Sequence, residues 1–337
     1  MVILTCVGAL LGIAIGTGIG FGIRYLLKPA PLAGSEFENL EEFRRAMLAR
    51  DTRDEQSDGS VSFRSIILPH SSDRIIYTLK PSFEARFQRV PVKLNSHGMR
   101  SPERPFEKPV GTYRIALLGD SFAFGWGVEA DKIFAQVLED ELNRRFGGAP
   151  RIEVLNFGVP GYSTFQEGAL FEELGSKFKP DAVLVYFVNN DFGLPFFIKN
   201  FESPGEIVSN AQFKDLNRRS KQSQTEQKHK ELLKSLDANR ALKQLAKYCA
   251  EQGTRLFVTV NPRKGYEKDK RKLWALRHLP DVKLLELRER LLARIAAEQI
   301  APADLSLGWD PHPSPLKHRL LGELLAEDFA SVVKVSP

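Results

Sequence analysis

A serine, a histidine and a carboxylate in this sequence have the types and setting needed for nucleophilic catalysis. Ser121 follows an apolar run through a glycine-containing turn, in the segment 118–122. A hydroxyl at such a strand-to-helix turn can project over the end of the strand. It becomes a nucleophile only when a histidine takes its proton and a carboxylate orients that histidine. Serines in turns are by default caps or turn formers, so this segment alone leaves both interpretations open.

His312 is the histidine best placed to act as the base. It follows Asp310 by two residues, in the segment 310–314 just before the last predicted helix. The other five histidines lie in charged helical stretches, in an early β-type region, or in the last helix, where packing or exposure is expected: His70, His97, His229, His278 and His318. His312 and Asp310 are therefore the candidate base and its orienting carboxylate.

Two further loops contain groups that can donate hydrogen bonds. Glycines in the segment 156–163 leave the backbone free to aim N–H groups at a ligand, although a plain turn is an equally good interpretation. Asn189 and Asn190 follow another apolar run. Their side-chain amides suit a developing oxyanion, although such residues more commonly cap the next segment.

The elements that must position these residues begin at residue 113, where apolar runs alternate with amphipathic stretches. Strands are predicted at 113–118, 152–156, 182–188 and 255–260, and helices at 131–146, 164–178, 241–252, 282–298 and 315–333. Continuous apolar strands separated by helices indicate a parallel sheet covered on both faces. Ligands bind such a sheet at the carboxyl ends of its strands, where all of the candidate loops begin.

The amino-terminal part of the sequence predicts a membrane anchor. The stretch Val2 to Ile23 carries no charge and is long enough to span a bilayer. We therefore predict a transmembrane anchor at 1–28, a juxtamembrane linker at 29–60, a small accessory β region at 61–110, and the main domain at 111–337 with a long basic excursion at 192–240. Glycines with a spacing of four share one helix face, which either pairs with a second helix or simply faces lipid: Gly8, Gly12, Gly16 and Gly20.

Charge and composition exclude several functional classes. The net charge of +6 is mild, and neither zinc-ligand spacing nor an RNA-binding signature is present. We therefore expect no metal, cofactor or nucleic acid. Basic residues between 214 and 272 form either a solvated surface or a rim that faces an anionic partner. We expect a single-pass membrane protein with an extracytoplasmic catalytic domain, although Arg24 and Lys28 by themselves favour the opposite orientation.

The four polar segments, in this order, resemble the SGNH hydrolases, also called the GDSL esterase/lipase family, over residues 113–333. The segment 95–100 also resembles a lead-in found in bacterial members with an amino-terminal anchor. The resemblance implies a flavodoxin-like three-layer α/β/α sandwich. It implies Ser121 as nucleophile, His312 as general base and Asp310 as its orienting group. It also implies an oxyanion hole formed by the N–H groups of Ser121 and Gly161 and the side chain of Asn190.

Two departures from the family pattern leave alternatives open. Val188 stands where a glycine usually precedes the oxyanion asparagine by two positions, so Asn189 competes with Asn190. Only one residue separates Asp310 from His312 where better-known members have two, which leaves Asp304 as a distant substitute.

Three functions are consistent with this pattern. The first is serine-dependent hydrolysis of an acyl or acetyl ester of a glycan or lipid. The second is O-acyl transfer to a polysaccharide, which the shorter Asp–His spacing of some polysaccharide-acetylating relatives favours. The third is a non-catalytic, membrane-tethered binding protein.

Overall fold

The computed structural model describes residues 58–199, 206–210, 212 and 236–333. The predicted anchor, nearly all of the linker and most of the basic excursion lie outside these ranges. Within them, no helix combines the length and apolarity required to cross a bilayer.

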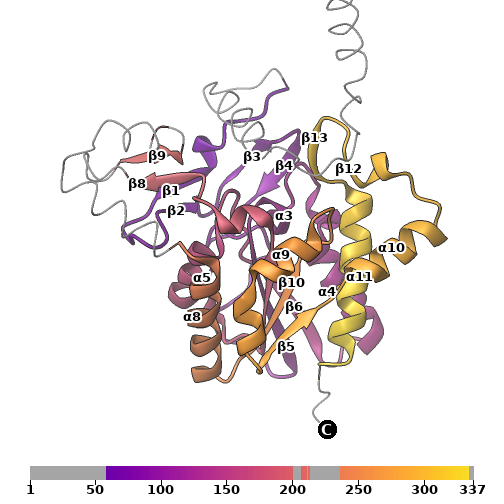
Figure 1. The fold of residues 1–337 in the computed structure, drawn as a ribbon. Coiled ribbons are helices and arrows are strands. Elements are labelled where there is room, and N and C mark those ends of the chain that lie inside the picture. The colour runs from indigo at the N-terminus through magenta and orange to yellow at the C-terminus, as the bar shows by residue number, and fades with distance from the viewer. Residues whose placement is uncertain (1–57, 200–205, 211, 213–235, 334–337) are drawn as a thin grey trace, which may run out of the picture.

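A five-stranded parallel sheet forms the centre of the fold (Figure 1). Its strands lie in the order β11, β10, β7, β5, β6, which is the order of a flavodoxin-like doubly wound sheet. Their bounds are Thr112–Gly119 for β5, Arg151–Asn156 for β6, Ala182–Phe187 for β7, Arg255–Val260 for β10 and Val282–Leu285 for β11. The predicted parallel α/β sheet is therefore confirmed.

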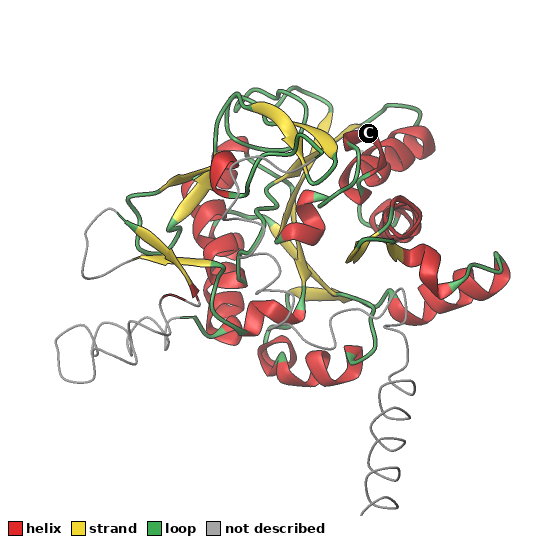
Figure 2. Ribbon diagram, turned by 90° about the horizontal axis from the view of Figure 1, so that it is seen from above, coloured by secondary structure: helices red, strands yellow, loops and turns green. Residues whose placement is uncertain are grey.

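Helices cover both faces of this sheet, as the view from above shows (Figure 2). Successive residues of β5 point to opposite faces, since Ile115 and Leu117 join one apolar cluster while Ala116 and Leu118 join the other. The first face packs against α4 (Phe134–Phe146), α10 (Arg288–Ala297) and α11 (Pro315–Ala330). The second packs against α5 (Thr164–Glu173) and α8 (Ala238–Glu251).

The prediction of one helix over 282–298 was wrong. Residues Val282–Leu285 form the edge strand β11, and α10 begins only at Arg288. The central strand β7 is buried at all six positions, whereas β11 has one buried residue, Leu285. A four-residue edge strand presents too short and too polar a run to be distinguished from the first turn of the helix that follows.

Several short elements were not predicted. Helix α9 (Tyr266–Lys272) lies in the basic run, and two antiparallel pairs lie near the catalytic candidates. These pairs are β8 (Phe197–Lys199) with β9 (Ile207–Ser209), and β12 (Ser306–Leu307) with β13 (Asp310–Pro313).

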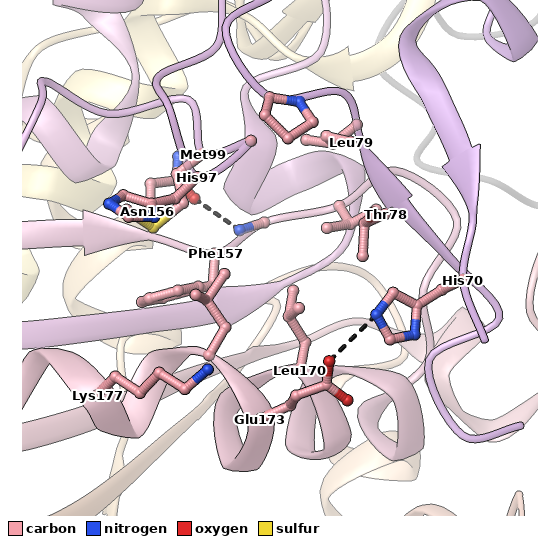
Figure 3. Close-up of a pocket in the computed structure, with 15 residues that line it drawn as sticks. His70, Thr78, Leu79, His97, Met99, Asn156, Phe157, Leu170, Glu173 and Lys177 are labelled. Carbon is pink, nitrogen blue, oxygen red and sulfur yellow. Dashed lines mark hydrogen bonds and ion pairs between the residues drawn. The ribbon is translucent and has the colours of Figure 1, made fainter. Parts of the chain in front are cut away.

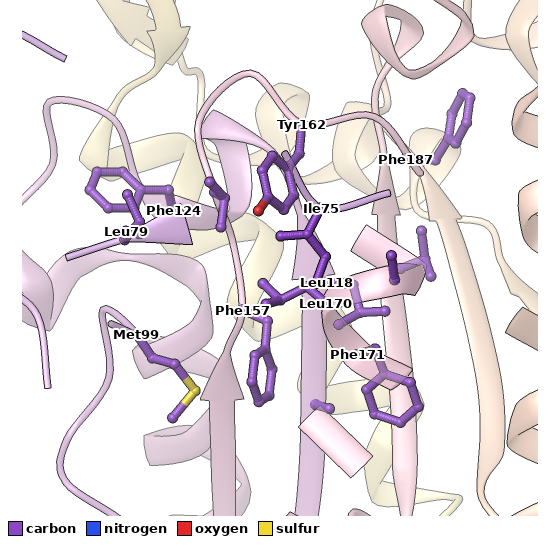
Figure 4. Close-up of a cluster of buried hydrophobic side chains, with 14 of the residues drawn as sticks. Ile75, Leu79, Met99, Leu118, Phe124, Phe157, Tyr162, Leu170, Phe171 and Phe187 are labelled. Carbon is purple, nitrogen blue, oxygen red and sulfur yellow. The ribbon is translucent and has the colours of Figure 1, made fainter. Parts of the chain in front are cut away.

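The region before the sheet folds as two hairpins. Strand β1 (Ile67–Pro69) pairs with β2 (Tyr77–Leu79), and β3 (Glu84–Phe87) pairs with β4 (Val90–Lys93). Apolar side chains from this region enter the same cluster as the sheet, where Leu79 of β2 and Met99, which follows β4, belong with Leu118 and Phe157 (Figure 4). The hairpins therefore share the core of the main domain.

Candidate active site

Ser121 lies directly beyond the carboxyl end of β5. It opens the short helix α3 (Ser121–Phe124), and the Asp120 carboxylate accepts a hydrogen bond from the Phe122 N–H at 2.9 Å as the helix cap. A Cβ on Gly119 would lie 2.7 Å from the Cβ of Ala123, so only glycine allows the chain to turn this sharply. Ser121 is 7% exposed, which places its hydroxyl in a largely dehydrated setting.

His312 and Asp310 come from the hairpin β12–β13, far from Ser121 in the sequence. The His312 Nε2 lies 2.7 Å from the Ser121 Oγ, and the His312 Nδ1 lies 2.6 Å from the Asp310 Oδ1. The same carboxylate oxygen accepts the His312 backbone N–H at 3.0 Å. With Nδ1 protonated toward Asp310, Nε2 is the acceptor for the serine proton. The three side chains therefore form one continuous hydrogen-bonded chain.

The strand conformation of Asp310–Pro313 explains the short spacing between the two residues. Side chains two positions apart in a strand point to the same side of it. Asp310 can therefore reach the ring of His312 across one intervening proline. By contrast, Asp304 is exposed and contributes its backbone carbonyl as the acceptor for the Ser314 hydroxyl.

Aromatic packing fixes the orientation of the imidazole. The Trp126 ring stacks on the ring of His312, with centroids 5.0 Å apart and an interplanar angle of 18°. Phe122 lies 5.3 Å away on a tilted plane. His312 is fully buried as a result. Neither aromatic residue was predicted, because nothing in the local sequence relates them to residue 312.

Asn190 lies beside the turn that carries Ser121. Its side-chain amide donates to the Asp120 Oδ2 at 2.8 Å, and the other oxygen of this carboxylate caps α3. Asp120 therefore ties the end of β5 to the 3-10 helix Asn189–Phe192 that follows β7. The side-chain oxygen of Asn189 is buried and receives no hydrogen bond within the described residues. Of the two asparagines, Asn190 is the one linked to the turn that carries Ser121.

Gly161 belongs to the loop after β6, which is anchored to the end of β5 by a 3.1 Å bond from the Val159 N–H to the Gly119 carbonyl. Its φ of +76° favours glycine, and a Cβ there would lie 2.4 Å from the Cβ of Phe196. Among the described residues, no acceptor takes the backbone N–H of Gly161 or of Ser121. Both are therefore available as donors at this edge of the sheet.

Comparison with known proteins places this geometry in a family. The sequence model of the GDSL-like lipase/acylhydrolase family matches residues 117–320, which is more than half of the chain and includes Ser121, Asn190 and His312. The chain belongs to this family. It is therefore an ester hydrolase of the SGNH/GDSL class.

The chain is also similar to several solved structures at low sequence identity. A lipase/acylhydrolase from Enterococcus faecalis is 15% identical, with a TM-score of 0.40 over 67% of this chain and 99% of its own. The psychrotrophic esterase EstA from Pseudoalteromonas sp. is 14% identical, with a TM-score of 0.42 over 65% and 97%. A putative lipolytic G-D-S-L protein from Desulfitobacterium hafniense is also 14% identical, with a TM-score of 0.41 over 64% and 98%. No curated protein matches the chain.

His318 of this GDSL hydrolase lies in helix α11 and has a packing role. His318 is fully buried, accepts the Phe134 N–H at 3.1 Å on Nδ1, and stacks on the Phe134 ring. Burial lowers the pKa of His318 to about 3, so the ring is neutral at ordinary pH. Its role is packing between α11 and α4.

A cavity of about 180 Å³ lies behind the loop that follows β6 (Figure 3). Its lining includes His70 and Glu173, whose Nε2 and Oε1 lie 3.1 Å apart, together with Met99 and Phe157. None of Ser121, His312 and Asp310 lines it. Across the described parts of the chain, no three histidine, cysteine or acidic side chains gather in a way that could hold a metal ion.

Three buried carboxyl groups lie beneath the catalytic edge of the GDSL fold. Burial raises the pKa of Asp120, against the hydrogen bonds from the Phe122 N–H and Asn190. Burial and the neighbouring carboxyls hold the pKa values of Glu167 and Asp191 well above their usual range. One oxygen of Asp191 accepts the Val188 N–H at 2.7 Å, and the carboxyl groups of Asp191 and Glu167 are hydrogen-bond partners of each other. Burial and the mutual repulsion of the two carboxylates therefore both favour the protonated form of the Glu167–Asp191 pair.

This pair predicts a specific pH dependence of stability. A carboxyl whose folded pKa is raised stabilises the fold most below its unfolded pKa of about 4, and this contribution is lost as pH rises toward the folded pKa. Glu167→Gln removes one such group, so its unfolding free energy should fall less steeply than that of the wild type between about pH 5 and pH 8, by up to about 1.4 kcal/mol per pH unit. Urea unfolding followed by circular dichroism measures the difference. Glu251→Gln, on the exposed end of α8, serves as the control, and parallel curves for wild type and Glu167→Gln would refute the prediction.

Proposed function

We propose that this enzyme hydrolyses carboxylic esters through a covalent acyl-enzyme on Ser121. The observation that carries the proposal is the unbroken chain from the Ser121 Oγ through His312 to Asp310, with links of 2.7 and 2.6 Å. Such a chain makes a serine nucleophilic, because the imidazole accepts its proton and the carboxylate stabilises the imidazolium that forms.

The reaction follows from this arrangement in two stages. The Ser121 Oγ attacks the ester carbonyl while its proton passes to the His312 Nε2. The tetrahedral intermediate collapses, and the leaving alcohol takes that proton. Water, deprotonated by His312, then attacks the acyl-enzyme and releases the carboxylic acid and the free serine.

The oxyanion of each tetrahedral intermediate is proposed to accept hydrogen bonds from the N–H groups of Ser121 and Gly161 and from the Asn190 amide. The support is that both backbone donors have no acceptor within the described residues, and that Asn190 is held beside the nucleophile turn through Asp120. Donors that are already oriented lower the barrier without reorganising during the reaction.

Asn190→Ala is accordingly expected to lower kcat by about 10²–10³-fold with little change in KM, because the donor acts on the transition state. Steady-state hydrolysis of p-nitrophenyl acetate measures the effect. Asn189→Ala is the matched control, and we expect its kcat to remain near that of the wild type. Equal kcat values for Asn190→Ala and the wild type would remove Asn190 from the oxyanion hole.

A short acyl group, such as acetyl on a glycan or lipid, is the proposed substrate class. The support is that Ser121 is 7% exposed and that the rings of Phe122 and Trp126 pack on His312, to which Ser121 is hydrogen-bonded. The apolar segment Val2 to Ile23 would hold the domain at a membrane, and we propose an extracytoplasmic placement. Hydrolysis of p-nitrophenyl esters from acetate to palmitate by the full-length protein tests this. A maximum at acetate is expected, and a rate that rises with chain length would contradict it.

Transfer of the acyl group to a sugar hydroxyl is the second candidate, and the single residue between Asp310 and His312 favours it. Product analysis with an acetyl ester donor and a polysaccharide acceptor separates the two candidates. Free acetate supports hydrolysis, and acetylated polysaccharide supports transfer.

The third function, a non-catalytic binding protein, would depend on basic side chains that are free to contact an anionic partner. The described basic residues 263–272 give this function little support. Arg263 pairs with Asp269 at 2.7 Å, and Lys270 pairs with Glu286. Two of the cations on which a basic rim would depend are therefore neutralised within the fold.

A further inference from the structure

Arg100 is a buried cation next to the catalytic turn. It is 3% exposed, and its guanidinium donates to three backbone carbonyls: Nη1 to Phe124 at 3.1 Å and to Gly125 at 2.6 Å, and Nη2 to Val128 at 2.6 Å. Its guanidinium carbon also lies 5.0 Å from the centre of the Phe124 ring. Within the described residues, the hydrogen bonds of the Arg100 guanidinium all go to the end of α3 and to the turn that follows it.

These carbonyls belong to the end of α3 and to the turn beyond it. The last carbonyls of a helix lack intrahelical donors and need partners from elsewhere. Gly125 ends α3 in the left-handed conformation with φ of +81°, and its N–H returns to the Ser121 carbonyl at 3.1 Å. The Trp126 N–H donates to the same carbonyl at 3.1 Å. The loop held by Arg100 is thus hydrogen-bonded to the backbone carbonyl of Ser121.

The same loop also reaches the base. Trp126 lies between the carbonyls of Gly125 and Val128 that Arg100 binds, and its ring is stacked on His312. One side chain therefore restrains both partners of the 2.7 Å contact between Ser121 and His312.

The way in which Arg100 is buried distinguishes it from an ordinary structural arginine. Arg114 is equally buried, but it pairs with the Glu153 carboxylate at 2.8 Å at the opposite edge of the sheet. No carboxylate within the described residues forms an ion pair with Arg100, and burial lowers its pKa to about 10. A buried cation without a carboxylate partner is costly to desolvate, and the Nε of Arg100 also has no acceptor among the described residues. A hydrophobic side chain at this position could not donate to the three carbonyls.

We propose that Arg100 is a positioning residue of the active site. It holds the loop 124–128 so that the Ser121 Oγ and the His312 Nε2 stay within hydrogen-bonding distance. Residue 100 lies outside the family match at 117–320, so the segment before the hydrolase domain supplies this support. The inference rests on the proposed esterase function, and it gives the predicted lead-in 95–100 a physical role.

The test compares Arg100→Met and Arg100→Lys with Arg114→Met in the full-length protein. A misplacement of about 1 Å at the reacting atoms costs about 100-fold in rate, so Arg100→Met should lower kcat for p-nitrophenyl acetate by about that factor. KM should change by less than about twofold, because Arg100 touches no substrate. Arg100→Lys retains the charge but not the forked geometry of the guanidinium, so its kcat should lie between those of the wild type and Arg100→Met. Arg114→Met should lower the melting temperature while leaving kcat per folded molecule near that of the wild type.

The possible outcomes separate this inference from the proposed function. An inactive wild type would defeat the esterase proposal itself. An active wild type with an unchanged kcat in both Arg100 variants would overturn the positioning role and leave the esterase intact. A loss of kcat in the Arg100 variants that follows only the fraction unfolded, measured by circular dichroism, would also overturn it, because that is the behaviour expected of Arg114→Met. If Arg100→Met does not fold, Arg100→Lys alone decides the question.

Discussion

Ser121→Ala should lower kcat for ester hydrolysis by about 10⁶-fold, the order of loss seen when the serine is removed from the Ser-His-Asp triad of a serine protease. The reason is that alanine leaves His312 without a group to deprotonate, while the donors at the sheet edge remain. Circular dichroism of the variant should match that of the wild type, because the Ser121 hydroxyl contributes a catalytic contact and no cap. Steady-state kinetics with p-nitrophenyl acetate at saturating substrate measures the effect.

Two comparisons sharpen this prediction. Ser331→Ala, in the exposed turn after α11, should leave kcat unchanged. The double variant Ser121→Ala/His312→Ala should be no slower than Ser121→Ala alone, because the two residues act as a unit. Additive losses in the double variant, or a residual rate within tenfold of the wild type in Ser121→Ala, would show that the hydroxyl is not the nucleophile.

Asp310→Asn should lower kcat by about 10⁴-fold while the fold stays intact. The Asp310 Oδ1 accepts both the ring Nδ1–H and the backbone N–H of His312. An amide in its place can donate to Nδ1, which selects the tautomer with the proton on Nε2. That nitrogen then can no longer accept the proton of Ser121.

Asp304→Asn is the matched control for the same substitution. Asp304 is exposed and supplies a backbone carbonyl to Ser314, so its side chain should be dispensable for kcat. A large loss in Asp304→Asn with a small one in Asp310→Asn would reverse the assignment of the orienting carboxylate. The pH dependence of kcat in Asp310→Asn, measured alongside that of the wild type, would show whether the remaining activity depends on the tautomer.

The sequence predicted those parts of the fold in which burial imposes a pattern. Strand β7 is buried along its whole length and reads as an unbroken apolar run, and β5 is buried from its second residue onward. At the edge of the sheet, only Leu285 of β11 is buried. Its four residues were therefore assigned to the helix that follows them. A hydrophobic pattern reports how deeply an element is buried, so within the central sheet it failed to reveal the edge strand.

Residue types in the catalytic loops were predictable for a similar reason. Ser121, Asn190 and the His312 loop follow or flank predicted elements, and their chemistry is visible in the side chains themselves. The contacts that orient them were not predictable, because Trp126 on His312 and Arg100 on the loop 124–128 join segments distant in the sequence. The short spacing of Asp310 and His312 was ambiguous until the strand β13 placed both side chains on one side.

The most direct test of a nucleophilic Ser121 is reaction of the full-length protein with a fluorophosphonate, followed by mapping of the modified peptide. Stoichiometric phosphonylation of Ser121 is predicted, with His312→Ala reacting far more slowly because nothing then accepts the serine proton. Modification of a different serine, or no modification of a folded protein that still hydrolyses esters, would contradict the account.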